Sequence, residues 1–296
     1  MYTFLFLMVI DFIMRKAINN PAFGIEWGAR RLADLDFADD VALLSRTLDG
    51  LQKMSDNIQE IGSKVGLHIS SEKTKAMIIG KKEYPPVEIN QRHIEYVDSF
   101  QYLGSYTSRD GDIEMETRTR IGKAASVFQK MSPVWRSGTI GRDIKLRLYS
   151  SIVIPTAIYA CETWKRTKKI SQRLNVFHRR CLRTILGISW RDHITNEEVL
   201  RMAGSEDLEI TVETRRRKMA GHILRMPAQR PAKKALTWIP EGGRRNRGRP
   251  KKTWRSTFKE DLTAMGIDWN EAEETARNRT EWRNLVDQCS EKNERN

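Results

Sequence analysis

The chain has 296 residues, 39% of them hydrophobic and 30% charged, with a net charge of +14. This length is sufficient for about two domains with hydrophobic cores, and the regular spacing of the apolar residues argues against a disordered chain. The positive excess is confined to the central part: residues 111–205 hold 18 Lys/Arg against 8 Asp/Glu, and residues 206–255 hold 15 against 5. Such a block favours a polyanionic partner, because binding would release counterions from a phosphate backbone; a simply hydrated basic surface is the alternative.

Cysteine usage and the first apolar run indicate the compartment. Cys161, Cys181 and Cys289 are widely spaced and form no CxxC pair, which favours a reducing, intracellular setting over a disulfide framework. His178 and Cys181 have i, i+3 spacing, but without a second close ligand pair they are better explained as ordinary core and surface residues than as a zinc site. The apolar run at residues 4–10 is too short to span a bilayer and lacks the basic start of a signal peptide. We therefore expect a nuclear or cytoplasmic protein without a membrane segment, in which this run is a buried core helix.

Two adjacent carboxylates, Asp39 and Asp40, lie between the apolar, alternating segments 35–37 and 41–43. Period-two alternation on both sides of a short polar break predicts a β-hairpin with the acids at its tip. Adjacent like charges repel each other, and a divalent cation relieves that repulsion. Carboxylate oxygens are the hard ligands that Mg²⁺ prefers, so the hairpin is a candidate metal site; an exposed acidic turn is the alternative.

The N-terminal third continues with helices and strands in alternation. Apolar residues three to four positions apart predict a helix that Thr47 caps and Gly66 ends. Residues 67–69 and 76–79 are predicted strand segments around a polar stretch that contains Lys73. Residues 87–94 and 100–104 are predicted to be extended as well. Helices mixed with antiparallel strands indicate an α+β fold for residues 1–110.

The remainder of the chain is predicted to be mainly helical. Helices are expected up to Pro133, from about 142 to a stop at Pro155, and from about 171 to 186. Thr195 and Glu198 predict a capping box, and Arg215 begins the basic face of a further helix. A Gly/Arg-rich linker without core-forming residues and a terminal helical pair follow, the pair running from residue 258 to Gly266 and from 270 to 286. We divide the chain into five segments: 1–110, 111–168, 169–239, 240–256 and 257–296.

In their order, these motifs resemble the reverse transcriptase of non-LTR (LINE-like) retrotransposons. The Phe-Ala-Asp-Asp sequence at residues 37–40 matches a palm motif of this family, and residues 4–14 resemble the palm helix before it. Residues 66–74 resemble the next palm motif, and residues 100–104 resemble the segment that grips the primer end. Residues 111–168 stand in the place of the thumb, and residues 170–290 resemble the long C-terminal region. The resemblance implies a partial polymerase palm followed by a mainly α-helical thumb and C-terminal region.

The resemblance also implies a reaction: RNA-directed DNA synthesis, in which two Mg²⁺ or Mn²⁺ ions assist nucleotidyl transfer. Its partners would be an RNA template, a DNA primer or target, and deoxynucleoside triphosphates. Asp39 and Asp40 would be the catalytic metal ligands, and Lys73 would act on the pyrophosphate, although a surface lysine explains Lys73 as well. The primer contacts would be three residues, for which an ordinary buried strand is the alternative: Tyr102, Leu103 and Gly104.

The sequence departs from the family at the third carboxylate. That residue belongs to an earlier strand motif, expected upstream of Phe4, and the fingers are missing too. Asp11 lies on a helix that would not face the metals. Asp34 and Asp36 lie in the incoming strand, where Asp36 alternates away from Phe37 and could approach the site. We therefore expect a catalytically incomplete fragment of the polymerase. The alternative is a non-catalytic nucleic-acid-binding protein that acts through its basic helical C-terminal half.

Basic and aromatic residues outside the hairpin leave several interpretations open. Residues 247–250 read Arg-Gly-Arg-Pro and resemble the core of an AT-hook, in which arginines enter a narrow A·T minor groove; a flexible linker or nuclear-import signal is the alternative. The implied contacts are Arg247, Arg249, Lys251 and Lys252. Trp238 and Trp254 either stack on bases or pack on the flanking helices. Arg179, Arg180 and Arg183 either contact phosphates or are solvated.

Overall fold

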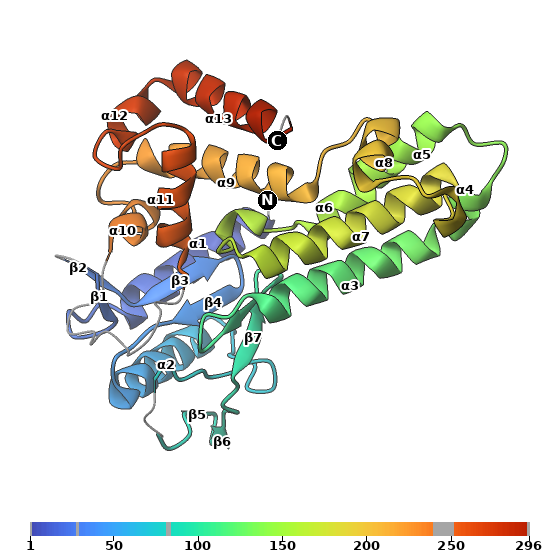
Figure 1. The fold of residues 1–296 in the computed structure, drawn as a ribbon. Helices are drawn as coiled ribbons and strands as arrows, with labels where there is room; N and C mark the ends of the chain where they lie inside the picture. The colour runs from blue at the N-terminus through green and yellow to red at the C-terminus, as the bar shows by residue number, and fades with distance from the viewer. Residues whose placement is uncertain (1, 28–29, 81–83, 239–251, 295–296) are drawn as a thin grey trace. The chain divides into compact units, whose positions relative to one another are not determined.

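The computed structural model is an α+β protein, as predicted, and describes residues 2–27, 30–80, 84–238 and 252–294 (Figure 1). The chain divides into two compact units, which we call the N-terminal unit (Met1–Asp112) and the C-terminal unit (Ile113–Asn296). All described strands belong to the N-terminal unit. The finer division of the chain into five segments stays a prediction.

The N-terminal unit combines two helices with short antiparallel hairpins. Strand pairing in the described residues is local: β1 pairs with β2, β3 with β4, β5 with β6, and β7 with β8. The elements are α1 (Tyr2–Ala17), β1 (Ile25–Trp27), β2 (Arg30–Leu32), β3 (Asp34–Phe37), β4 (Asp40–Leu43), α2 (Leu48–Ser63), β5 (Glu88–Ile89), β6 (Arg92–His93), β7 (Ser99–Tyr102) and β8 (Ser105–Ser108).

Helix α1 is not the buried core helix that its composition predicts. Its side toward α2 is covered, with Ile13 and Met14 buried, and the Asn57 side chain of α2 donates to the Ala17 carbonyl at 2.8 Å. On its other side Phe4 is 68% exposed and Met8 55% exposed. A helix that is apolar on all sides is normally enclosed on all sides, but within the described part of the N-terminal unit α1 packs mainly through the side that faces α2. The expectation of burial is therefore wrong for residues 4–8.

Helix α2 confirms the predicted capping. The Thr47 side chain accepts a hydrogen bond from the Gly50 amide at 3.1 Å, and Gly66 follows the helix with φ +79°.

The strands predicted after α2 are mostly wrong. Residues 67–69 are not a strand, because the Gln59 side chain binds the Ile69 amide at 3.0 Å. In 76–79 the strand pairing is limited to one isolated bridge, from Ala76 to Tyr96. Residues 87–94 contain the β5–β6 hairpin rather than one extended stretch, because Asn90 and Gln91 both adopt positive φ. An apolar pattern indicates an extended segment but does not specify a partner strand for it.

The C-terminal unit is helical in all its described regular elements. In Figure 1 they run from the green α3 to the red α13. The α-helices are α3 (Glu114–Lys130), α4 (Ser132–Arg136), α5 (Arg142–Leu148), α6 (Ile154–Ala157), α7 (Lys168–Leu186), α8 (Asn196–Ala203), α9 (Leu208–Leu224), α10 (Pro231–Thr237), α11 (Trp254–Ala264), α12 (Ala272–Arg277) and α13 (Arg279–Glu294). Short 3₁₀ turns occupy Cys161–Thr163 and Trp190–Asp192, and a π-helical segment, Tyr149–Val153, joins α5 to α6.

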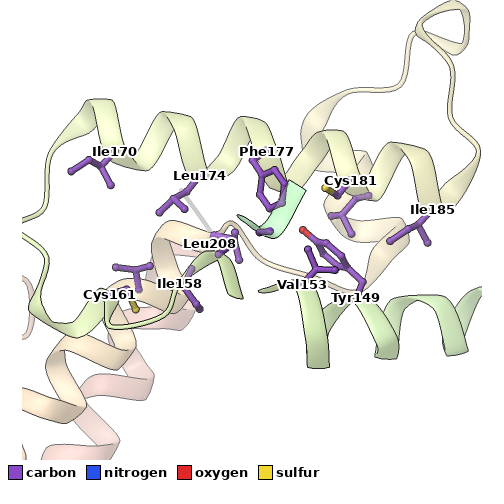
Figure 2. Close-up of a cluster of buried hydrophobic side chains, with 14 of the residues drawn as sticks. Tyr149, Val153, Ile158, Cys161, Ile170, Leu174, Phe177, Cys181, Ile185 and Leu208 are labelled. Atoms are coloured by element: carbon purple, nitrogen blue, oxygen red, sulfur yellow. The ribbon is translucent and has the colours of Figure 1, made fainter. Parts of the chain in front are cut away.

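Helix α7 carries one apolar face into the main core. The Thr167 side chain accepts from the Ile170 amide at 3.3 Å at its start, and Gly187 ends it with φ +71°. Figure 2 shows side chains that project from one side of α7 toward Tyr149, Val153 and Leu208. These buried residues of α7 are Ile170, Leu174, Phe177, Cys181 and Ile185. A second cluster packs α9 against α11, α12 and α13 around Phe258, Leu262 and Trp282.

Helix ends in this unit differ from the prediction at three places. Pro155 does not stop the helix; it stands in the first turn of α6, where a missing N–H breaks no helical hydrogen bond. The helix predicted over 270–286 is broken at Asn278, whereas the predicted stop at Gly266 is confirmed with φ +71°. Thr195 caps α8 through the Glu198 amide at 3.2 Å, but the Glu198 carboxylate binds Arg201 instead of completing the capping box.

His178 is a buried core histidine, both of whose ring nitrogens lie beside hydroxyl groups. Its Nδ1 lies 2.8 Å from the Tyr149 hydroxyl, and its Nε2 lies 3.1 Å from the Ser205 Oγ. In the described part of the chain, no group of three or more His, Cys, Asp or Glu side chains is placed to hold a metal ion. Burial lowers the pKa of His178 from 6.5 to about 4, because an imidazolium would lose its hydration in this core.

This burial predicts acid sensitivity of the C-terminal unit. The unfolded chain takes up a proton at His178 below pH 6.5, but the folded chain does so near pH 4. Between these values the unfolded state binds more protons, so the free energy of unfolding falls as the pH falls, by as much as about 3 kcal/mol. Denaturant unfolding followed by tryptophan fluorescence reports this unit, since seven of the eight tryptophans belong to it. His178→Gln should show a flatter profile than His222→Gln, which alters an exposed ring; equal slopes would contradict the assignment.

Candidate functional site

The candidate site is centred on the β3–β4 hairpin, which forms as the alternating pattern predicts. Phe37 pairs with Asp40, so Ala38 and Asp39 make a two-residue turn. Ala38 has φ +56°, as tight hairpins require at the first turn position, and this left-handed conformation is unfavourable for alanine. Asp39 stands at the tip and Asp40 begins β4, and both are exposed.

The register of the hairpin assigns its side chains to two faces. Cross-strand partners share a face, so Asp40 lies on the side of Phe37 and Leu35. Asp36 pairs with Val41 on the other side. On the face that carries Asp40, the Phe37 side chain is 63% exposed in the described structure. The strand geometry keeps Asp36 off that face, in line with the expectation that it alternates away from Phe37.

A second hairpin brings one predicted primer-contact residue to this site. β7 and β8 are joined by a turn at Leu103 and Gly104, whose φ values are +47° and +80°. The Tyr102 hydroxyl donates to the Leu35 carbonyl at 2.9 Å. Burial, followed by the negative charges of Asp36 and Asp40, raises the pKa of Tyr102, so its hydroxyl stays protonated and remains a donor.

Among the described residues, the structure records no contact between Lys73 and the β3–β4 hairpin. It lies exposed in the turn at residues 71–73, which the Thr74 amide closes by donating to the Ser70 carbonyl at 3.0 Å. The neighbouring Lys75 pairs with Glu95 at 2.6 Å. The role of Lys73 in catalysis therefore stays a prediction.

Asp34 and Asp36 form an acidic pair on β3, and the structure shows that their carboxyl groups interact. Partial desolvation, then the neighbouring carboxyl group of Asp34, then the charge of Asp11 raise the pKa of Asp36 to about 7. Asp11 itself is paired with Arg15 at 3.0 Å. Residues i and i+2 of a strand share a face, so the spacing of Asp34 and Asp36 could have revealed this pair. The hairpin thus carries carboxylates on both faces.

These donors do not complete a two-metal centre. Such a centre needs three carboxylates around two divalent ions, whereas Asp39 and Asp40 supply two, and no third acidic group of the described residues is arranged with them. The opposite placement of Asp36 removes the nearest candidate. The residues present therefore do not fit the full magnesium site, and binding of Mg²⁺ stays a prediction for the parent enzyme.

Of the four AT-hook-like residues, one can be located. Arg247, Arg249 and Lys251 lie outside the described residues. Lys252 is paired with Glu260 at 2.9 Å. Trp254 donates its indole N–H to the Glu162 carbonyl at 2.8 Å and stacks on Phe258, so it packs on the helices and does not offer a free face to a base.

The basic face predicted from Arg215 onward is wrong for its two central residues. Arg216 and Arg217 lie in the middle of α9 and are completely buried. Arg216 binds Asp261 of α11 at 3.3 Å, and Arg217 binds Glu213 at 2.8 Å. A run of four basic residues covers all sides of a helix, so two of them must face the core, where acidic partners neutralise them.

Comparisons with known proteins connect the chain with transposons. No family model matches it. It is 26% identical over 267 residues to an uncharacterized transposon-derived protein of Caenorhabditis elegans, a match that covers 86% of this chain and 94% of that protein. It is 25% identical over 162 residues to a retrovirus-related Pol polyprotein from the type-1 retrotransposable element R2 of Nasonia vitripennis. This second match covers 51% of the chain but only 16% of the polyprotein. Among the described residues, no helix has the length and apolarity needed to cross a membrane.

Proposed function

We propose that the chain is a retrotransposon-derived portion of an RNA-directed DNA polymerase, which retains a catalytic hairpin without a complete catalytic centre. The observation that carries this proposal is the tight turn with Asp39 and Asp40, to whose hairpin Tyr102 is hydrogen-bonded. The similarity to the R2 polyprotein supports the origin. The parent enzyme would copy an RNA template onto a DNA primer with deoxynucleoside triphosphates and Mg²⁺ or Mn²⁺, inside the nucleus or cytoplasm.

The donor set argues against polymerase activity of this chain by itself. Transfer of a nucleotide requires one metal ion to activate the primer 3′-hydroxyl and a second to stabilise the leaving pyrophosphate. Two exposed carboxylates on one turn can attract one hard cation, but exposed ligands without a third partner hold it weakly. The chain lacks the ligand geometry for both ions in its described part.

Primer extension on poly(rA)/oligo(dT) with Mg²⁺ or Mn²⁺ tests this proposal. We expect the chain to incorporate no more labelled thymidine nucleotide than its Asp39→Asn variant. Asp49→Asn, which alters an exposed carboxylate of α2, is the matched control. Incorporation that Asp39→Asn abolishes and Asp49→Asn retains would show a working active site and would overturn the claim of incompleteness.

A second candidate function is non-catalytic binding of nucleic acid by the basic C-terminal unit. It is favoured by helix α7, which contains six Lys/Arg and no Asp or Glu in 19 residues. Such a surface would attract phosphate backbones, with an affinity that falls steeply as the salt concentration rises.

A further inference from the structure

Helix α7 has a basic face opposite to its apolar one. Figure 2 shows apolar residues of α7 turned toward the core. With about 3.6 residues per turn, the basic residues of the helix fall on the other side of its circumference, together with the exposed Val176. Those basic residues are Lys168, Lys169, Arg173, Arg179, Arg180 and Arg183. Because the helix rises about 1.5 Å per residue, they extend over roughly 22 Å, which is long enough for several consecutive phosphates.

Nearby carboxylates neutralise only part of this charge. Lys169 and Arg173 share Glu114 at 2.7 and 3.4 Å. Arg179 is paired with Asp207, and Glu197 also lies close enough to feel its charge.

The other three cations keep their charge available. Arg183 donates to the neutral Ile194 carbonyl and Asn196 side chain, at 2.8 and 3.2 Å. Lys168 and Arg180 are exposed, and neither has an ion pair within the described chain. The face therefore has more cations than anions, which favours an anionic ligand.

An exposed tryptophan stands beyond the C-terminal end of this face. Trp190 is 80% exposed, in a 3₁₀ turn that Ser189 and Asp192 close by a reciprocal cap. The Asp192 carboxylate accepts from the Ser189 amide at 2.6 Å. The Arg191 guanidinium lies 5.5 Å from the centre of the indole ring, so a cation accompanies the aromatic surface. A large apolar ring exposed to water on a capped turn has the properties of a binding element, because a ligand that covers it removes apolar surface from water.

Hydrogen bonds tie this turn to the basic face. The Ile188 amide donates to the Arg183 carbonyl at 2.9 Å, which closes the end of α7. The Arg183 side chain reaches Ile194 and Asn196, two residues that follow the turn. Trp190 is therefore held between two segments that are anchored to the same arginine of the basic face.

We propose that the basic face of α7 and Trp190 together bind single-stranded nucleic acid. Phosphates would lie along Arg180 and Arg183, and an unpaired base would stack on the exposed indole of Trp190. A base has a free π-face only when it is unpaired or at a strand end, which selects single strands over duplexes. An acidic peptide would satisfy the cations but would leave the indole without a stacking partner. This inference rests on the second proposed function and names its surface and ligand class.

Fluorescence anisotropy with labelled oligo(dT), and with an abasic phosphodiester oligomer of the same length, tests the inference on the full chain. Trp190→Ala should weaken oligo(dT) binding about tenfold, because one base stack is lost, and should leave abasic binding unchanged. Arg180→Gln should weaken both ligands and make the salt dependence shallower. Arg201→Gln removes an exposed charge of α8 that is paired with Glu198, and should change neither.

Each other outcome has a defined meaning. If wild-type chain binds neither oligomer, both this inference and the second proposed function fail. If it binds oligo(dT) with a steep salt dependence but Trp190→Ala and Arg180→Gln do not matter, the function stands and this surface is wrong. Equal loss on both ligands in Trp190→Ala would overturn the stacking. Polyglutamate that binds more tightly than oligo(dT) of equal charge would show that the surface prefers an acidic polypeptide. Circular dichroism confirms the fold of each variant, and all three altered side chains are exposed.

Discussion

Asp261→Asn is expected to lower the free energy of unfolding of the C-terminal unit by about 3–5 kcal/mol, because it leaves buried guanidinium groups without their anion. Asp261 is fully buried and lies 3.3 Å from Arg216 and 3.9 Å from Arg217. Arg216 also donates to the Trp164 carbonyl and, at 2.9 Å, to the Thr257 hydroxyl. The amide of asparagine would retain an acceptor but would remove the charge that compensates both arginines.

The network around Asp261 is balanced as a whole, which is why a single neutral substitution is costly. Arg166 binds both Glu213 and Glu260, and Glu213 also binds Arg217. The network therefore pairs three guanidinium groups with three carboxylates. They come from α9, from α11 and from the segment before α7. Urea unfolding followed by tryptophan fluorescence measures the effect. Asp287→Asn, which alters an exposed carboxylate 3.9 Å from Lys218, is the control and should change stability by less than about 0.5 kcal/mol. A comparable loss in the two variants would contradict the assigned role of the network.

Gly221→Ala is expected to destabilise the same unit by about 1–3 kcal/mol or more, because α9 and α13 touch at this glycine. A Cβ atom at Gly221 would lie 2.3 Å from the Trp282 indole nitrogen and 2.7 Å from two of its ring carbons. The indole cannot easily move away, since it is buried and donates to the Arg217 carbonyl at 3.0 Å. The methyl group therefore has to separate the two helices or break that hydrogen bond.

Gly122→Ala is the matched control and should raise the free energy of unfolding, whereas Gly221→Ala should lower it. Gly122 also lies inside a helix, α3, but a Cβ atom there would meet nothing within 4 Å. Alanine at such a position stabilises a helix by about 0.5–1 kcal/mol, because it restricts the unfolded chain more than glycine does. The midpoint of thermal unfolding of both variants distinguishes the effect of the steric contact at Gly221 from the effect of helix propensity. If both substitutions stabilise the protein, the close approach of α9 and α13 is wrong.

Local sequence signals predicted those features of the site and of the fold that depend on residues close together in the chain. The β3–β4 hairpin follows from period-two alternation around two acids, and the Thr47, Thr195 and Gly66 signals identified helix ends that the structure confirms. Each of these features depends on residues a few positions apart. The Asp34–Asp36 pair belongs to the same class, because residues two positions apart in a strand share a face.

Features that depend on distant partners could not be predicted in this way. Tyr102 reaches Leu35 across 67 positions, and Arg216 meets Asp261 across 45. A sequence pattern shows that a helix carries four consecutive basic residues but not which two of them an acidic residue of another helix will meet. On the exposed side of α1 the local pattern predicted burial, but no neighbouring described element covers these apolar residues.

By itself the sequence determined the α+β class, the acidic hairpin and the basic character of the C-terminal unit, because backbone periodicity and net charge are properties of short segments. Only the tertiary structure decided that Asp36 lies on the face opposite to Asp40, that Arg216 and Arg217 are core residues, and that Trp190 is exposed in a turn whose flanking segments bind Arg183. Burial and electrostatic pairing depend on which elements pack together, and those contacts join residues that are far apart in the chain.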